Sequence, residues 1–176
     1  MTRSNAPHDR DVPDPAAPPR RVAVVGAGSA DEREERLAVE LGEHLAAAGA
    51  VVVTGGLGGV MAAASRGVRR AGGRTLAFLP GDDADQANPW VELPIPTGMG
   101  EGRNVLVVRA AEAVVAVGGE WGTLSEIAFA RKIRRPVCLL GRGPVAGLDL
   151  PCLDSAAGAA GWALAAASRF RAGERS

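Results

Sequence analysis

The feature that most constrains the fold of this chain is a series of short runs that are apolar at nearly every position. They are RVAVVGAG (21–28), AVVVTGG (50–56), RTLAFLP (74–80), AVVAVGG (113–119) and PVCLLG (136–141). A strand that is apolar throughout, and not only at alternate positions, is buried on both faces, which is typical of parallel sheets. The runs therefore predict the strands of a parallel sheet.

Segments with helical periodicity separate these strands. Leu37, Leu41 and Leu45 recur at helical spacing within 31–50, and Ser29 and Glu32 have the spacing of a capping box at the start of this helix. Further helices are expected at 59–73, 102–112, 122–135 and 155–170, an extended piece at 91–97, and loops at 81–90 and 141–154. The alternation predicts one α/β domain over 21–172, a doubly wound, mostly parallel, Rossmann-like sheet with helices on both faces.

Composition excludes several other classes of protein. The 176 residues include 20 basic and 20 acidic ones, so we expect no nucleic-acid-binding surface, which needs a basic excess. Residues 1–20 hold five prolines and no apolar segment, and they read as a disordered tail, not as a signal peptide. No apolar stretch reaches the roughly 18 residues of a membrane span. We expect a cytoplasmic protein without membrane contact.

The two cysteines and two histidines do not indicate a metal site. The spacing of Cys138 and Cys152 fits neither a zinc site nor a redox pair, and Cys138 lies in an apolar strand, which favours a buried structural thiol. His8 falls in the tail and His44 on the first helix. We therefore expect no bound metal and no cofactor.

Three of the predicted strands end in glycine-rich turns that lead into helices. The turns contain Gly26, Gly28 and Ser29 after the first strand, Gly55 and Gly56 after the second, and Gly118 and Gly119 at the end of the run 113–119. Glycine lets a ligand approach the backbone, and helix N-termini offer free N–H groups to anions. Because parallel strands end at one edge, the turns predict a phosphate site there, although tight connections alone would also explain them.

Two nucleotide-binding motifs are absent from these turns. The first turn lacks the third glycine of the dinucleotide fingerprint, and the chain contains no G-x-x-x-x-G-K-[ST] motif. A P-loop NTPase is therefore excluded.

Thr123 and Glu126 lie three residues apart and share one helix face. The pair has two readings, since it matches a capping box but also places a carboxylate beside the Gly118-Gly119 turn. Arg103 stands among glycines in GMGEGRN. A carboxylate that stabilises an oxocarbenium-like ribose, together with an arginine that makes bidentate bonds, would suit cleavage of an N-glycosidic bond.

The segments TGGLGGVMAAASRG, GRN and GGEWGTLSE resemble the LOG family of nucleoside 5′-monophosphate phosphoribohydrolases, once labelled lysine decarboxylases. The similarity covers residues 20–170 and is nearest to the subgroup that includes the molybdenum cofactor carrier proteins. It implies that Arg103 and Glu126 are catalytic. It also implies that the glycine loops hold the phosphate and close the pocket through Gly55, Gly56, Met61, Gly118, Gly119, Gly122 and Thr123.

The chain departs from the family pattern at the expected phosphate loop. Val117 replaces a proline, one extra residue (Glu120 or Trp121) separates Gly119 from Gly122, and Asn104 follows the arginine in place of lysine. These changes bear on hydrolysis more than on binding. Lysine decarboxylation is excluded because pyridoxal phosphate needs a Schiff-base lysine, and the only lysine, Lys132, lies beyond the N-terminal turn of its helix.

Two functions remain open from the sequence. The first is an enzyme that hydrolyses a nucleoside 5′-monophosphate to base and ribose 5-phosphate; the second is a carrier or sensor that binds molybdenum cofactor, a phosphorylated pterin, or a nucleotide. A scaffold with a vacant cleft is a third reading. Trp90 and Trp121 are expected near the cleft, to stack on a ring or to meet another subunit, and Trp162 in the core. Apolar residues on several faces of 102–112 and 123–134 predict a homodimer or higher homo-oligomer.

Overall fold

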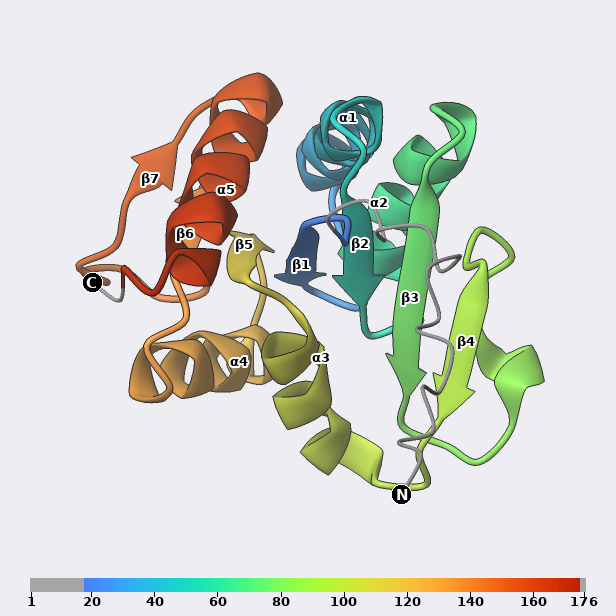
Figure 1. The fold of residues 1–176 in the computed structure, drawn as a ribbon. Coiled ribbons are helices and arrows are strands. Elements are labelled where there is room, and N and C mark those ends of the chain that lie inside the picture. The colour runs from blue at the N-terminus through green and yellow to red at the C-terminus, as the bar shows by residue number, and fades with distance from the viewer. Residues whose placement is uncertain (1–17, 175–176) are drawn as a thin grey trace, which may run out of the picture.

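The computed structural model describes residues 18–174, which form a seven-stranded sheet between two layers of helices (Figure 1). All strand pairs are parallel, in the order β4-β3-β2-β1-β5-β6-β7, so the predicted parallel α/β sheet is confirmed. The strands are β1 (Arg21–Gly26), β2 (Val51–Thr54), β3 (Arg74–Leu79), β4 (Leu93–Pro96), β5 (Ala113–Val117), β6 (Val137–Leu140) and β7 (Cys152–Leu153).

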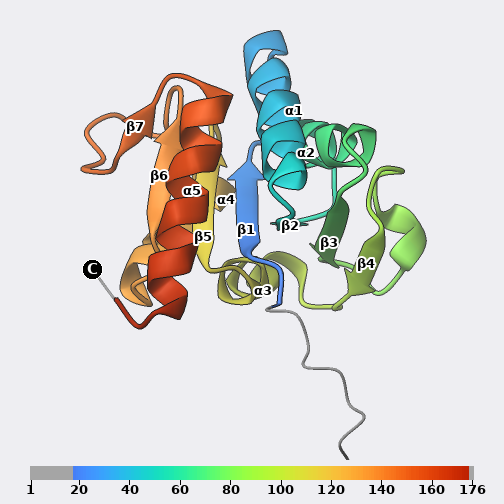
Figure 2. The same ribbon diagram turned by 45° about the horizontal axis from the view of Figure 1, so that its top comes forward.

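Helices cover both faces of this sheet (Figure 2). They are α1 (Glu32–Ala47), α2 (Gly59–Arg70), α3 (Asn104–Ala110), α4 (Trp121–Lys132) and α5 (Ala156–Arg171), with short 3₁₀ turns η1 (Ala84–Gln86) and η2 (Gly100–Arg103). Successive strand residues point to opposite faces. In β1, Val22 and Val24 pack under α1, α2 and α5, whereas Ala23 and Val25 pack under α3 and α4. Each central strand is therefore apolar throughout because it supplies two cores.

The order of the strands reverses at β1. The chain runs outward through β2, β3 and β4 on one side, and then continues with β5, β6 and β7 on the other side. The connections that leave β1 and β5 thus diverge to opposite sides, and a crevice opens beyond the carboxyl ends of these strands. In open α/β sheets this is the usual position of a ligand site.

The start of α1 differs from the prediction. Its N-cap is Asp31, whose side chain accepts a hydrogen bond of 2.8 Å from the backbone N–H of Glu34, while the Glu34 carboxylate accepts one of 3.2 Å from the Asp31 N–H. The expected box at Ser29 and Glu32 is wrong. A capping residue followed three positions later by glutamate occurs at Ser29 and again at Asp31, and the helix begins at the second of these.

Two elements lie in segments that were expected to be loops. The turn η1 lies within 81–90, and β7, only two residues long, lies within 141–154. The extended piece at 91–97 contains β4, which pairs with β3 at the sheet edge. Its Thr97 N–H donates to Leu79 O at 3.2 Å, so Pro94 and Pro96 stand at positions whose N–H would point away from β3.

Other expectations concern single residues and the chain ends. Cys138 is fully buried, as predicted, and burial raises the pKa of its thiol to about 12. Within residues 18–174, none of the helices has the length and apolar character to cross a bilayer. The predicted tail up to residue 17, with His8, lies outside the described residues.

Candidate functional site

A cleft of about 320 Å³ lies beyond the carboxyl ends of β1 and β2, at the reversal point of the sheet. Four parts of the chain contribute to it: the turn after β1, the turn after β2 with the start of α2, the η2–α3 junction, and the first turns of α4. Of the residues named from the sequence, it is lined by Gly26, Gly28, Gly55, Met61, Arg103, Gly122, Thr123 and Glu126.

The other four predicted residues do not line the cleft. Ser29 is exposed. The carbonyl of Gly56 accepts two hydrogen bonds from Asn88, of 2.8 and 3.0 Å, so this residue anchors the loop before β4. A side chain on Gly118 would collide with the carboxylate of Glu34 on α1, which shows that this glycine faces α1.

Gly119 packs against Thr123, a residue of the cleft wall. Its φ of +106° suits glycine, and an added Cβ would lie 2.3 Å from the Thr123 hydroxyl oxygen. The close approach lets Thr123, which is 3% exposed, sit in the cleft wall.

Arg103 is the central cation of the cleft. It lies at the end of η2, where this turn runs directly into α3, and only 6% of the residue is exposed. Its guanidinium lies over the backbone of Gly55, since a Cβ there would be 2.6 Å from Nη1 and Nη2. Among residues 18–174, Nη1 has one hydrogen-bond partner, Asn104 Oδ1 at 2.6 Å, and the buried Nε has none. The guanidinium therefore keeps donors that the described protein does not satisfy.

A chain of hydrogen bonds connects this arginine to α4. Asn104 Nδ2 donates to Ser125 Oγ at 3.3 Å, and the Ser125 hydroxyl donates to Gly122 O at 2.6 Å. Asn104, which departs from the lysine of the family pattern, thus fixes the guanidinium relative to the first turn of α4.

Glu126 projects from the second turn of α4 and is 6% exposed. Its Oε1 lies 3.9 Å from Arg103 Nη1, which is an ion-pair distance but too long for a hydrogen bond. Burial raises the pKa of Glu126 to about 8; the positive charge of Arg103 lowers it and the carboxylate of Glu101 raises it further. At pH 7 this carboxyl is therefore mostly protonated.

The capping interpretation of Thr123 and Glu126 is wrong. The helix begins at Trp121 with Glu120 as its N-cap, three residues earlier than a box with Thr123 as N-cap requires, and no side chain caps it. The start of α2, with Gly58 as N-cap, also lacks a side-chain cap. By contrast, α1 is closed by its own carboxylates, so two of the three expected helix starts can offer backbone N–H groups to an anion.

Carboxylates surround Arg103 in this cleft. Glu101 and Glu120 are exposed and line the rim, and Glu126 lies inside. Against them stands one guanidinium within the described residues. Glu101 was missed as a site residue, although its place two residues before Arg103 in GMGEGRN was the available signal.

The remaining candidates lie around or far from the cleft. Trp121 is 80% exposed at the start of α4, and Trp90 is half-exposed before β4. Trp162 packs against the core from α5, and His44 lies in the last turn of α1. Lys132 ends α4, whereas the cleft is at its start, so the only lysine of the chain lies about 9 Å along the helix beyond Glu126.

The fold defines a class of protein, the Rossmann-like α/β proteins, in which ligand sites usually lie at the reversal point of the parallel sheet, where this chain has its cleft. The chain belongs to the SLOG cluster4 family, whose model matches residues 19–158. A relative of uncharacterised function from Archaeoglobus fulgidus is 42% identical over 120 residues, which are 68% of this chain and 79% of that protein.

Solved structures agree with this assignment. The molybdenum cofactor binding protein from Rippkaea orientalis is 32% identical with a TM-score of 0.74, covering 80% of this chain and 93% of its own. The Moco carrier protein from Chlamydomonas reinhardtii is 35% identical with a TM-score of 0.74, covering 89% and 99%. DNA processing protein A from Streptococcus pneumoniae, at 18% identity and a TM-score of 0.66, covering 78% and 59%, shares the fold alone.

Proposed function

We propose that this protein binds and carries a phosphorylated pterin of the molybdenum cofactor type, without turning it over. The observation that carries the proposal is the buried guanidinium of Arg103, held over Gly55 with unsatisfied donors at the mouth of two uncapped helices. The similarity to proteins that are described as binding or carrying this cofactor supports the choice of ligand.

The cleft matches the chemistry of a phosphate monoester. A phosphate in the cleft would face the backbone N–H groups at the starts of α2 and α4. It would also lie at the positive ends of these two helix dipoles. Arg103 supplies a planar pair of donors for phosphate oxygens. In this proposal the phosphate lies between Arg103 and Thr123, and the pterin extends toward the rim beside Trp121.

The state of Glu126 favours carriage over hydrolysis. A carboxylate stabilises a developing ribose cation only when it is ionised. The pKa of Glu126 is raised to about 8, so at neutral pH this side chain is mostly neutral. A neutral carboxyl accommodates an anionic ligand in the cleft but gives no charge to a transition state.

Hydrolysis of a nucleoside 5′-monophosphate is the second candidate function. It is favoured by one observation: Arg103 and Glu126, which the LOG resemblance implies to be catalytic, face the same cleft 3.9 Å apart. The bond that would break is the N-glycosidic bond, with water replacing the base on C1 of the ribose.

One experiment separates the two functions. The purified protein is titrated calorimetrically with molybdenum cofactor and with AMP, and base release from AMP is followed by chromatography for the natural chain and for Glu126→Ala. Cofactor binding without base release supports the carrier. Base release that Glu126→Ala abolishes overturns it in favour of the hydrolase, and absence of binding by both ligands refutes both.

We also propose that the chain forms a homo-oligomer, but through another surface than the sequence indicated. Among residues 18–174, Trp121 is the only large exposed apolar side chain on α3 or α4. Four of the others lie on β4 or next to it, namely Leu93 and Ile95 on the strand and Trp90 and Met99 beside it. Light scattering of the natural chain and of Leu93→Glu tests this, and a monomer at all concentrations contradicts it.

A further inference from the structure

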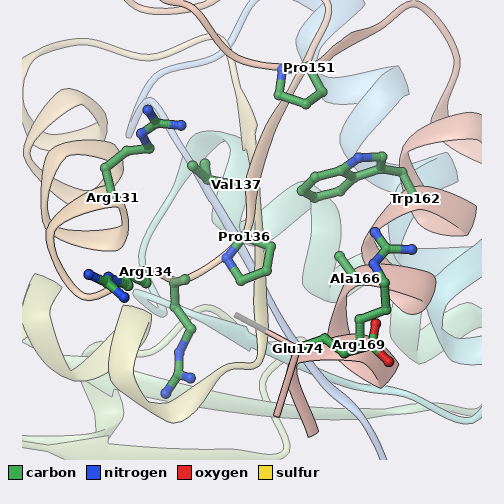
Figure 3. Close-up of a pocket in the computed structure, with 10 residues that line it drawn as sticks. Arg131, Arg134, Pro136, Val137, Pro151, Trp162, Ala166, Arg169 and Glu174 are labelled. Carbon is green, nitrogen blue, oxygen red and sulfur yellow. The ribbon is translucent and has the colours of Figure 1, made fainter. Parts of the chain in front are cut away.

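A second pocket lies at the opposite end of the sheet from the cleft. It has a volume of about 630 Å³ and is bounded by the C-terminal end of α4, the start of β6 and the second half of α5. Figure 3 shows Arg131 on the α4 side, Trp162 and Arg169 on the α5 side, and Pro136 and Val137 between them. The volume is in the usual range for a small-molecule site, about 300–1,000 Å³.

The charge of this pocket is opposite to that of the cleft. Four arginines line it, Arg131, Arg134, Arg135 and Arg169, against one carboxylate, Glu174. Arg135 already stacks on Phe170, with its guanidinium 4.0 Å from the ring centroid, and donates to Arg109 O at 3.0 Å. The guanidinium groups of Arg131, Arg134 and Arg169 have no hydrogen bond or ion pair within the part of the chain that the structure describes.

Favourable interaction with a helix dipole explains only part of this arrangement. Cations near a helix C-terminus interact favourably with the negative end of the helix dipole. Two helix ends that converge on one cavity, however, bring unpaired guanidinium groups around the same space, where they repel one another. A bound polyanion removes this repulsion, and guanidinium groups bind phosphate oxygens in planar pairs.

The backbone of Arg134 gives a second indication. It is the only residue other than glycine with a positive φ among residues 18–174, at +56°, directly after α4 ends. Glycine is the usual residue at this position, and another L-residue is strained there. The strained residue is therefore one of the arginines that line the pocket.

Trp162 supplies the other half of a recognition site. It is half-buried, it packs on the core from α5, and its ring forms a wall of the pocket together with Pro136 and Pro151. Such a fixed aromatic face favours stacking on a planar ring of a ligand. The pocket therefore presents one aromatic wall and several unpaired cations.

We propose that the pocket between α4 and α5 binds a nucleoside polyphosphate, with the base against Trp162 and the phosphates between Arg131, Arg134 and Arg169. This site is separate from the cleft and does not depend on the function of the cleft. A ring and at least two phosphates together match the tryptophan and the three guanidinium groups, whereas inorganic phosphate would engage only the cations.

The test follows the fluorescence of Trp162 in Trp90→Phe/Trp121→Phe, a chain that keeps this tryptophan alone. Titration with ATP is expected to quench it, with adenosine and pyrophosphate each binding at least about tenfold more weakly. Arg134→Gly/Arg169→Gln should weaken ATP binding at least about tenfold. Arg134→Gly suits the backbone at +56°, so a loss of binding does not reflect misfolding.

Two controls keep this site distinct from the proposed carrier function. Arg103→Ala, which disables the cleft, should leave ATP quenching unchanged, and so should Arg33→Gln, which removes an exposed arginine of α1 outside the pocket. ATP binding that is lost in Arg103→Ala, or that survives in Arg134→Gly/Arg169→Gln, overturns the proposal. So does a hexaglutamate peptide that binds as tightly as ATP, because the pocket would then recognise an acidic protein segment.

Discussion

The two ends of the sheet hold cavities of opposite construction. At the carboxyl ends, the cleft combines glycine backbone, uncapped helix starts and one buried arginine with three carboxyl groups. At the amino ends, the basic pocket combines arginine side chains at two helix C-termini with one tryptophan. Anion binding as proposed for the cleft would rest on the backbone of the fold, whereas in the basic pocket it would rest on side chains that the fold brings together.

This difference has a consequence for charge. In the proposed function the carboxyl groups of the cleft oppose a bound phosphate when they are ionised, so the protonation of Glu126 is expected to control binding. The basic pocket has an excess of cations at any pH near neutrality. Variants of Glu126, Arg103 and Arg134 test whether only the cleft depends on pH.

The largest effect should appear in the stability of Glu126→Gln. The pKa of Glu126 is raised from 4.5 to about 8 in the folded protein, so the stability that its protonated form contributes is complete below pH 4.5 and is lost as the pH rises through 8. At about 1.4 kcal/mol per pKa unit, the loss is on the order of several kcal/mol. Urea unfolding of the natural chain and of Glu126→Gln should diverge between pH 5 and pH 9, with the variant more stable at pH 9.

The exposed Glu120, on the same helix, provides the control: Glu120→Gln should follow the natural chain at each pH. Parallel curves for Glu126→Gln and the natural chain would show that burial does not perturb this carboxyl group.

Removal of Arg103 should have the next largest effect. Hydrogen bonds to charged groups contribute about 1.5–3 kcal/mol, so Arg103→Ala should weaken binding of molybdenum cofactor by roughly 10- to 100-fold. Arg134→Gly removes the same charge from the basic pocket and should leave this affinity unchanged. Calorimetry measures both, and equal losses would mean that the cofactor responds to the overall charge of the protein, not to the cleft.

The affinity of the cleft should also depend on pH. A phosphate monoester has its second ionisation near pH 6, so its charge is nearly constant above pH 7. As the pH rises through about 8, Glu126 loses its proton and adds a negative charge beside the ligand, and cofactor affinity should fall by about three- to tenfold. Glu126→Gln should bind equally well at pH 7 and pH 9. Affinity that rises with pH in the natural chain would contradict the proposed position of the phosphate.

The smallest effect should come from the strained arginine of the basic pocket. Arg134→Gly relieves a positive φ, which gains about 1–2 kcal/mol, and raises the entropy of the unfolded chain, which costs about 0.5–1 kcal/mol. A net stabilisation of about 0.5–1 kcal/mol is expected in urea unfolding. The same change in a helix, Arg33→Gly, should destabilise the protein by about 1 kcal/mol. If Arg134→Gly destabilises the protein as Arg33→Gly does, then contacts of the Arg134 side chain stabilise the fold by more than its positive φ costs.

The sheet was predictable because burial on both faces leaves a direct trace in the sequence. Val114, Val115 and Ala116 are buried in turn under opposite helix layers, so β5 could only be a central strand. The two-residue strand β7 leaves no such trace, since Cys152 and Leu153 stand alone between polar and proline residues. The start of α1 was ambiguous because Ser29 and Asp31 both precede a glutamate by three residues.

The candidate site was predictable in part. Arg103 and Glu126 were expected to face each other, and they lie 3.9 Å apart although 23 positions separate them in the chain. The position of the guanidinium over Gly55 could not be read from either motif, because it depends on how η2 packs against the end of β2. The basic pocket left no local signal at all, since Arg131 and Arg169 read separately as ordinary cations at helix ends.

The two prolines of β4 limit how this sheet can grow. With Pro94 and Pro96 at outward positions, the free border lacks the donors that an incoming strand would need at those two positions. The apolar side chains of Leu93 and Ile95 can therefore attract a second molecule without templating a continuous cross-molecule ladder. The proposed association at this border would therefore rest on side-chain contacts, and the two prolines disfavour the open-ended strand addition that leads to fibres.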